Sequence, residues 1–283
     1  MLSEAFLRRL DTLRPALRSR ARGGSGGTRK SRMLGTSAEF SDFREYAPGD
    51  DIRRIDWNAY ARFDKLFLKL FMEEQEAMIT VFVDGSASMA EKWPAARGMA
   101  EAFSYAALSG GDRVRVAVAA PDGPLSCAFG TGRRDYPRLS SYLADYAPKG
   151  QTDFSQAVRR LDPYPKGMTL LISDFLYEDA GSAALTALRY RGQEACAVQL
   201  MSPEELRPAL SGPVRLTDQE GGTPLDLSMD GETLRQYEKR LNEFLQQVRG
   251  NCHRQGVPYV LMDSGENIED TMIRAFLHAG ILS

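Results

Sequence analysis

The arrangement of apolar and polar positions changes at Met78. From there to the C-terminus, short apolar runs alternate with longer segments that repeat apolar residues at helical spacing. The runs predict strands at 78–83, 113–119, 125–129, 168–173, 195–200 and 257–262. The segments between them predict helices at 94–109, 134–146, 153–161, 180–191, 232–255 and 267–278. Because this order is typical of a parallel sheet covered on both faces, we expect an α/β fold with a doubly wound, mostly parallel, six-stranded sheet flanked by helices.

Two further patterns lie in and before this region. The extended runs VRLTD and PLDLS flank a pair of glycines, which predicts a small β-hairpin insert at 212–230. Near the N-terminus, apolar residues recur at helical spacing and predict an amphipathic helix at 2–20, which Pro15 would kink or end. A glycine-rich run at 23–27 then predicts a flexible linker.

These patterns divide the chain into three parts. A basic helical arm with its linker occupies 1–34, and the α/β domain occupies 78–283. The segment between them, 35–77, is rich in aromatic and charged residues and is expected to pack on the domain. Within it, alternation in the run LFLKLF at 66–71 predicts a strand.

The composition excludes several classes of protein. With 43% hydrophobic and 26% charged residues the chain is globular rather than disordered. No apolar run approaches the roughly 20 residues that cross a bilayer, and no secretory signal is recognisable, so we expect a cytoplasmic protein without a transmembrane segment. The three widely spaced cysteines indicate buried, reduced thiols rather than a disulfide framework. Only two histidines occur, both near the C-terminus, which argues against a zinc site.

Charge is unevenly distributed. Residues 1–32 carry nine basic and two acidic side chains, although the net charge of the whole chain is −2. Such an arm could bind RNA or another anionic surface through residues 8–32. A solvated amphipathic helix followed by a linker explains the same charges, and both interpretations stay open.

Oxygen-bearing side chains follow three of the predicted elements. Asp84, Ser86 and Ser88 come directly after the strand at 78–83, in the sequence DGSAS. Thr152 lies on the loop before the third predicted helix, and Asp174 follows the strand that ends at 173. Because loops at the carboxyl ends of parallel strands meet at one edge of the sheet, we expect these five side chains to converge.

These five side chains suit a hard metal ion. Two carboxylates and three hydroxyls favour one divalent cation, Mg²⁺ first and Mn²⁺ second, in octahedral oxygen coordination. Neutral hydroxyl ligands would leave such an ion with much of its charge and with a position for an outside carboxylate. Taken singly, each residue has a structural interpretation as a helix cap or a turn former, and Asp153 is a further candidate cap. Their joint occurrence in this order favours the metal site.

The same residues carry a family resemblance. The order D-x-S-x-S, then threonine, then aspartate resembles the metal-ion-dependent adhesion site of von Willebrand factor A domains. The segments SAEFSDFREYAPGDDIRRIDWNAYAR, at 37–62, and VDGSASM, at 83–89, resemble the bacterial domain-of-unknown-function family fifty-eight. The resemblance runs from about Gly35 to the C-terminus and implies a von Willebrand factor A-like fold. Gln151 and Phe175 depart from the pattern, because glycine is frequent at both positions.

The resemblance also implies a function. Members of this family are typically encoded beside MoxR-type AAA+ ATPases, so we expect a non-catalytic, metal-dependent adaptor that binds an acidic residue of such an ATPase or of its client. One alternative is a metal-dependent phosphohydrolase. That chemistry would ask for a second acid where Ser86 stands, and the chain has no P-loop. RNA or anionic-surface binding through the basic arm is the other alternative.

The segment upstream of the domain has two interpretations. Its aromatic residues Trp57, Tyr60 and Phe63 are expected to be packing residues. Its charged residues could form either a second binding surface or a salt-bridged turn: Glu39, Arg44, Asp50, Asp51, Arg53, Arg54 and Asp56.

Overall fold

A computed structural model describes residues 2–17, 39–47, 50, 52, 55–72, 78–162, 167–208, 212–216 and 225–283. The chain divides into two compact units. The larger unit comprises Met1–Gly23 and Ala77–Ser283, and the smaller unit comprises Gly24–Glu76.

The larger unit is built on one six-stranded sheet. Its strands are β3 Met78–Asp84, β4 Arg113–Ala120, β5 Gly123–Phe129, β6 Gly167–Ser173, β7 Glu194–Met201 and β10 Tyr259–Asp263. Their order is β10-β7-β6-β3-β4-β5, and every neighbouring pair is parallel except β4 and β5. The prediction of a mostly parallel, six-stranded sheet is therefore confirmed.

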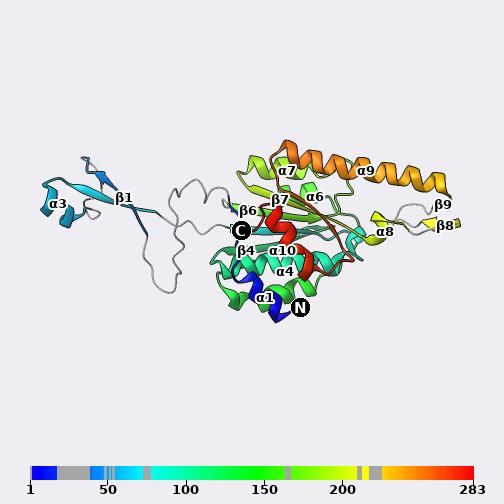
Figure 1. Ribbon diagram of the computed structural model, residues 1–283, viewed down its shortest axis with the longest axis horizontal. Helices are drawn as coiled ribbons and strands as arrows, with labels where there is room; N and C mark the ends of the chain where they lie inside the picture. The colour runs from blue at the N-terminus through cyan, green and yellow to red at the C-terminus, as the bar shows by residue number, and fades with distance from the viewer. Residues whose placement is uncertain are drawn as a thin grey trace. The chain divides into compact units, whose positions relative to one another are not determined.

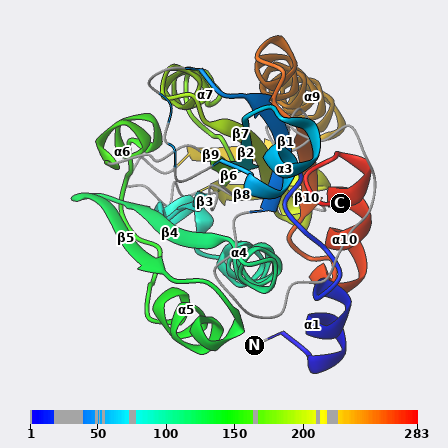
Figure 2. The same ribbon diagram turned by 90° about the vertical axis from the view of Figure 1, so that its left-hand side faces the viewer.

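Helices cover both faces of this sheet (Figures 1 and 2). One face carries α1 Glu4–Leu10, α4 Trp93–Ser109, α5 Tyr136–Ala144 and α10 Ile268–His278. The other face carries α6 Phe154–Arg160, α7 Ser182–Tyr190 and α9 Gly231–Arg254. Side chains of a strand point alternately to the two faces, so Val81 and Val83 enter the first core while Phe82 enters the second. Two buried cores thus fix the strands whose ends carry the candidate site.

The boundaries of these elements agree with the sequence patterns. In the sheet region, the predicted bounds of each strand and helix lie within two residues of the observed bounds. The structure adds short elements that the patterns did not predict, among them the 3-10 helix η2 Ala87–Met89 and the four-residue helix α8 Pro203–Leu206. Both follow the carboxyl end of a strand.

The predicted hairpin insert is present. β8 Gly212–Leu216 pairs antiparallel with β9 Leu225–Met229. The glycine pair at the centre of the insert lies outside the described residues.

The helix predicted at 2–20 is wrong in its second half. α1 ends at Leu10, and the backbone N–H groups of Arg14 and Ala16 donate to the carbonyls of Ser283 and Ile281. Proline has no N–H to continue a helix, and Pro15 instead forms a β-bridge with Leu282. The helical spacing of the later leucines reflects packing on the first core. Residues 18–38, which include most of the basic arm and the glycine linker, lie outside the described residues.

Within its described residues, the smaller unit contains a two-stranded antiparallel sheet and one short α-helix. β1 Glu39–Glu45 pairs antiparallel with β2 Phe67–Met72, and β2 confirms the strand predicted from LFLKLF. Between them lies α3 Trp57–Phe63.

Two expectations for this segment can be compared with the structure. Trp57 is 63% exposed and Phe63 is 67% exposed, so neither side chain is packed within the smaller unit. None of the residues of α3 is buried. Among the charged residues, Arg44 pairs with Asp50 at 2.8 Å, and Asp56 caps α3. These contacts favour the salt-bridged turn, although Asp51, Arg53 and Arg54 lie outside the described residues.

Candidate functional site

The five predicted ligands lie at the carboxyl edge of the sheet. Asp84 is the last residue of β3, and Asp174 directly follows β6, the parallel neighbour of β3. Ser86 and Ser88 belong to the turn that forms η2. Thr152 lies on the loop that precedes α6, and the next residue caps that helix, as predicted for Asp153.

Hydrogen bonds join four of the five residues. The backbone N–H of Ser86 and the hydroxyl of Thr152 both donate to Oδ1 of Asp84, at 3.0 and 3.2 Å. The hydroxyl oxygens of Ser86 and Ser88 are 3.0 Å apart. Burial raises the pKa of Asp84, and the charge of nearby Asp174 raises it further. The structure thus brings Asp84, Ser86, Ser88 and Thr152 together, as the sequence predicts, with the charge of Asp174 nearby.

Backbone contacts hold the two loops against each other. The N–H of Ala87 donates to the carbonyl of Gly150 at 2.8 Å, and the N–H of Lys149 donates to the carbonyl of Gly85 at 3.1 Å. The hydroxyl of Tyr146 also donates to that carbonyl, at 3.0 Å. A Cβ atom at Gly85 would collide with this hydroxyl and with the backbone of β4. The loop can therefore approach its neighbours this closely only with glycine at that position.

The second oxygen of Asp84 has partners that sequence reasoning did not identify. The hydroxyl of Ser173 donates to Oδ2 at 2.7 Å, and the hydroxyl of Tyr177 donates to the same oxygen. Burial and the adjacent charge of Asp84 raise the pKa of Tyr177 well above its usual range. Asp84 therefore accepts hydrogen bonds from four groups, which fix the orientation of its carboxylate.

Asp174 has a buried cation as its partner. Lys92 Nζ donates to Asp174 Oδ2 at 2.8 Å and to Glu205 Oε1 at 2.7 Å. The side chains of Lys92 and Asp174 are each only 1% exposed. Burial by itself would lower the pKa of Lys92, but the two carboxylates outweigh it and the pKa is raised. Lys92 therefore remains charged and compensates part of the negative charge of the site.

The spacing of two hydroxyls at the site is compatible with a small divalent cation. Two ligands about 2.1 Å from an octahedral ion lie roughly 3.0 Å from each other when they are at right angles. The hydroxyls of Ser86 and Ser88 have this separation. Across the described ranges, no group of three or more His, Cys, Asp or Glu side chains could hold a metal ion. A metal site in this part of the chain would therefore need neutral oxygen ligands, such as hydroxyls, beside its carboxylates.

Comparison with known proteins places the chain in a family. The model of the family described as "Protein of unknown function DUF58" matches residues 42–246, which include every residue of the candidate site. The chain belongs to the DUF58 family. This confirms the family resemblance that the segments at 37–62 and 83–89 carry.

Individual relatives of this DUF58 chain are similar over most of its length. It is 28% identical over 232 residues to the uncharacterized proteins Rv1480 of Mycobacterium tuberculosis (strain H37Rv) and Mb1516 of Mycobacterium bovis. The alignment covers 78% of this chain and 73% of each relative. Among solved structures, it is similar to the conserved hypothetical protein BatB from Bacteroides thetaiotaomicron, with a TM-score of 0.44 and 16% identity over 72% of this chain and 98% of that chain.

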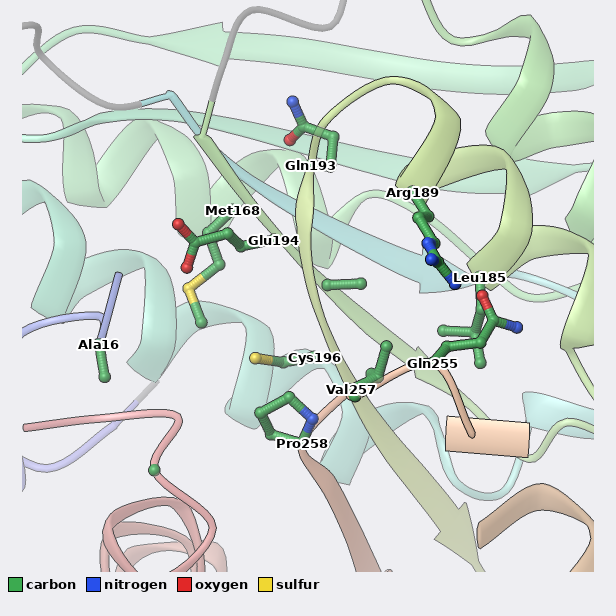
Figure 3. Close-up of a pocket in the computed structure, with 13 residues that line it drawn as sticks. Ala16, Met168, Leu185, Arg189, Gln193, Glu194, Cys196, Gln255, Val257 and Pro258 are labelled. Carbon is green, nitrogen blue, oxygen red and sulfur yellow. The ribbon is translucent and has the colours of Figure 1, made fainter. Parts of the chain in front are cut away.

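The DUF58 chain also has a cavity of about 190 Å³ at the opposite edge of the sheet (Figure 3). Side chains from α7, from the start of β7 and from the segment before β10 surround it. The cavity and the candidate site lie at opposite ends of β6. Met168, near the start of this strand, lines the cavity, and Asp174 follows the end of the strand. The cavity is therefore not part of the candidate site. The sequence patterns gave no sign of it.

No helix within the described ranges of this DUF58 protein combines the length and the apolar character needed to span a membrane.

Proposed function

We propose that this DUF58 protein is a non-catalytic, metal-dependent protein-binding adaptor with a von Willebrand factor A-like domain. One divalent cation, Mg²⁺ or Mn²⁺, would be held by Asp84, Ser86, Ser88, Thr152 and Asp174. The observation that carries the proposal is the 3.0 Å separation of the Ser86 and Ser88 hydroxyls beside the buried carboxylate of Asp84.

The charge of the site favours an acidic partner. Hydroxyl ligands add no negative charge, and Lys92 compensates part of the charge of Asp174. The cation supplies Lewis-acid attraction for a carboxylate from outside. A Glu or Asp side chain of a partner is the ligand that this chemistry prefers. The family resemblance points to a MoxR-type AAA+ ATPase, or a client of that ATPase, as the protein that supplies it.

The hydrogen bonds around the site argue for binding rather than catalysis. A general base has to take up and release a proton in each cycle, which a carboxylate held by fixed donors does less readily. Asp84 accepts four hydrogen bonds, and Asp174 accepts from Lys92 and from the N–H of Leu176. Asp153 accepts from the N–H of Gln156 as the cap of α6. Each nearby carboxylate thus already has a structural role.

A capture experiment tests the adaptor role. The full chain is immobilised and incubated with a purified MoxR-type ATPase in 5 mM Mg²⁺ or in EDTA, at about 50 and 300 mM salt. We expect capture in Mg²⁺ at both salt concentrations and none in EDTA. Binding through the basic arm at 8–32 would instead survive EDTA and weaken steeply with salt, because it rests on exposed charges.

Two variants complete that experiment. Ser88→Ala removes a proposed ligand whose side chain contacts Ser86. Asp153→Asn changes the residue next to Thr152. Asp153 caps α6 and lies outside the proposed ligand set. Loss of capture with Ser88→Ala and normal capture with Asp153→Asn would support the adaptor role. Equal capture by both variants, or capture that EDTA does not affect, would contradict it.

A further inference from the structure

Lys92 connects the candidate site with a helix that is not part of it. Lys92 directly precedes α4, and its ammonium bridges Asp174, which follows β6, to Glu205 of α8, which follows β7. The side chain of Lys92 is 1% exposed, whereas that of Glu205 is 28% exposed. The ion pair therefore runs from the buried end of the site towards its surface.

The carboxylate of Asp174 has two potential cationic partners. It belongs to the proposed ligand set, and its Oδ2 atom already accepts a hydrogen bond from Lys92 at 2.8 Å. A divalent cation would be attracted to the same carboxylate and repelled by the ammonium. Glu205 acts in the opposite direction, because it adds a negative charge beside the site and draws the ammonium away from Asp174.

We propose that Lys92 is a positioning residue that weakens the affinity of the candidate site for a divalent cation and links occupancy of the site to α8 through Glu205. This inference rests on the proposed function, since it concerns the regulation of the same site. Lys92 lowers the cation affinity of the site and Glu205 raises it, although the two residues form one ion pair.

The contacts of α8 carry the effect further. The second oxygen of Glu205 accepts from the backbone N–H of Ser202, which closes the capping box of α8. The backbone carbonyl of Glu205 accepts from the hydroxyl of Tyr237 on α9 at 2.7 Å. A change in the Lys92–Glu205 pair would therefore act on the whole of α8 and on the first turns of α9, which lie beside it (Figure 1).

Titration with Mn²⁺ by isothermal calorimetry tests the effect on affinity. Lys92→Met keeps the length of the side chain without its charge, and we expect it to bind Mn²⁺ about tenfold more tightly than the natural chain. Glu205→Gln leaves the ammonium less compensated, and we expect it to bind Mn²⁺ about fivefold more weakly. Lys92→Arg retains the charge and should stay close to the natural chain. A purely structural ion pair would instead change affinity in the same direction in both neutral variants.

Hydrogen exchange tests the link to α8. The N–H groups of Leu206 and Arg207 donate to the carbonyls of Ser202 and Pro203, at 3.0 and 2.8 Å. We expect Mn²⁺ to change the exchange rates of these amides in the natural chain and to leave them unchanged in Glu205→Gln. Thermal melts confirm that each variant is folded. If Lys92→Met does not fold, Glu205→Gln decides alone, because its side chain is partly exposed.

The outcomes separate this inference from the proposed function. Mn²⁺ uptake by the natural chain, with unchanged affinity in folded Lys92→Met and Glu205→Gln, would overturn the inference and leave the proposed function standing. Uptake by Lys92→Met but not by the natural chain would support the inference and contradict the proposed function. Uptake by neither would overturn both.

Discussion

Tyr177 donates its hydroxyl hydrogen to Oδ2 of Asp84, from the loop that follows the neighbouring strand β6. The ring of Tyr177 is stacked on that of Phe154, with centroids 5.9 Å apart and planes at 5°. Packing in the second core thus fixes the position of a hydroxyl that orients the central carboxylate of the candidate site.

Replacing Tyr177 tests this contact. Tyr177→Phe keeps the stacked ring but removes one of the four donors to a buried carboxylate. We expect the free energy of unfolding to fall by about 1–3 kcal/mol, because a buried carboxylate loses one of its hydrogen-bond donors. Urea denaturation measures this change. Tyr190→Phe is the matched control, since Tyr190 is 89% exposed and should change stability little. Equal stability of the two variants would show that the Tyr177 hydroxyl contributes nothing.

The docking of α1 should depend on pH through Glu269. The hydroxyl and the backbone N–H of Ser3, the cap of α1, donate to the Glu269 carboxylate and lower its pKa. A carboxyl group with a lowered pKa in the folded state contributes stability at pH values above its unfolded pKa, and this contribution is lost as the pH falls through the folded pKa. We therefore expect the protection of the α1 amides, relative to the intrinsic exchange rate at each pH, to decrease below about pH 4.

The matched variant for that experiment is Glu269→Gln. Its α1 amides should exchange faster than those of the natural chain at pH 7, and the difference should disappear as the pH approaches 3. A difference that persists at low pH would mean that another group holds α1.

The three cysteines should differ in reactivity. Cys196 and Cys252 are buried, whereas Cys127 is half-buried. Burial raises the pKa of Cys252 to about 12. Because the thiolate is the reactive form, we expect Cys252 to stay unmodified by a disulfide reagent at pH 8 and Cys127 to react first. Mass spectrometry of the modified chain identifies the site. Fast modification of Cys252 in the folded protein would contradict its burial.

Much of the fold could be predicted because its elements depend on local patterns. The apolar runs at 78–83 and 168–173 coincide with β3 and β6, and parallel strands that lie side by side bring Asp84 and Asp174 to one edge. The five proposed ligands could be identified for the same reason. The order of strands and helices determines where strand ends meet, whatever the details of packing.

The remaining residues of the site depend on contacts between distant parts of the chain. Lys92 is separated by 82 residues from Asp174 and by 113 from Glu205, and in the sequence it resembles an ordinary surface lysine of a turn. The donors Ser173 and Tyr177 likewise reach Asp84 only through tertiary packing. The helix predicted at 2–20 failed for a related reason, because Leu17 is buried by packing rather than by helical periodicity.

The most direct test of the proposed cation site is a Mn²⁺ titration of the purified full chain, followed by electron paramagnetic resonance of the free ion. We expect one bound ion per chain, at least tenfold weaker binding in Ser86→Ala/Ser88→Ala, and unchanged binding in Asp153→Asn. The absence of uptake by the natural chain, or equal uptake by the double variant and the natural chain, would contradict a cation held by these hydroxyls.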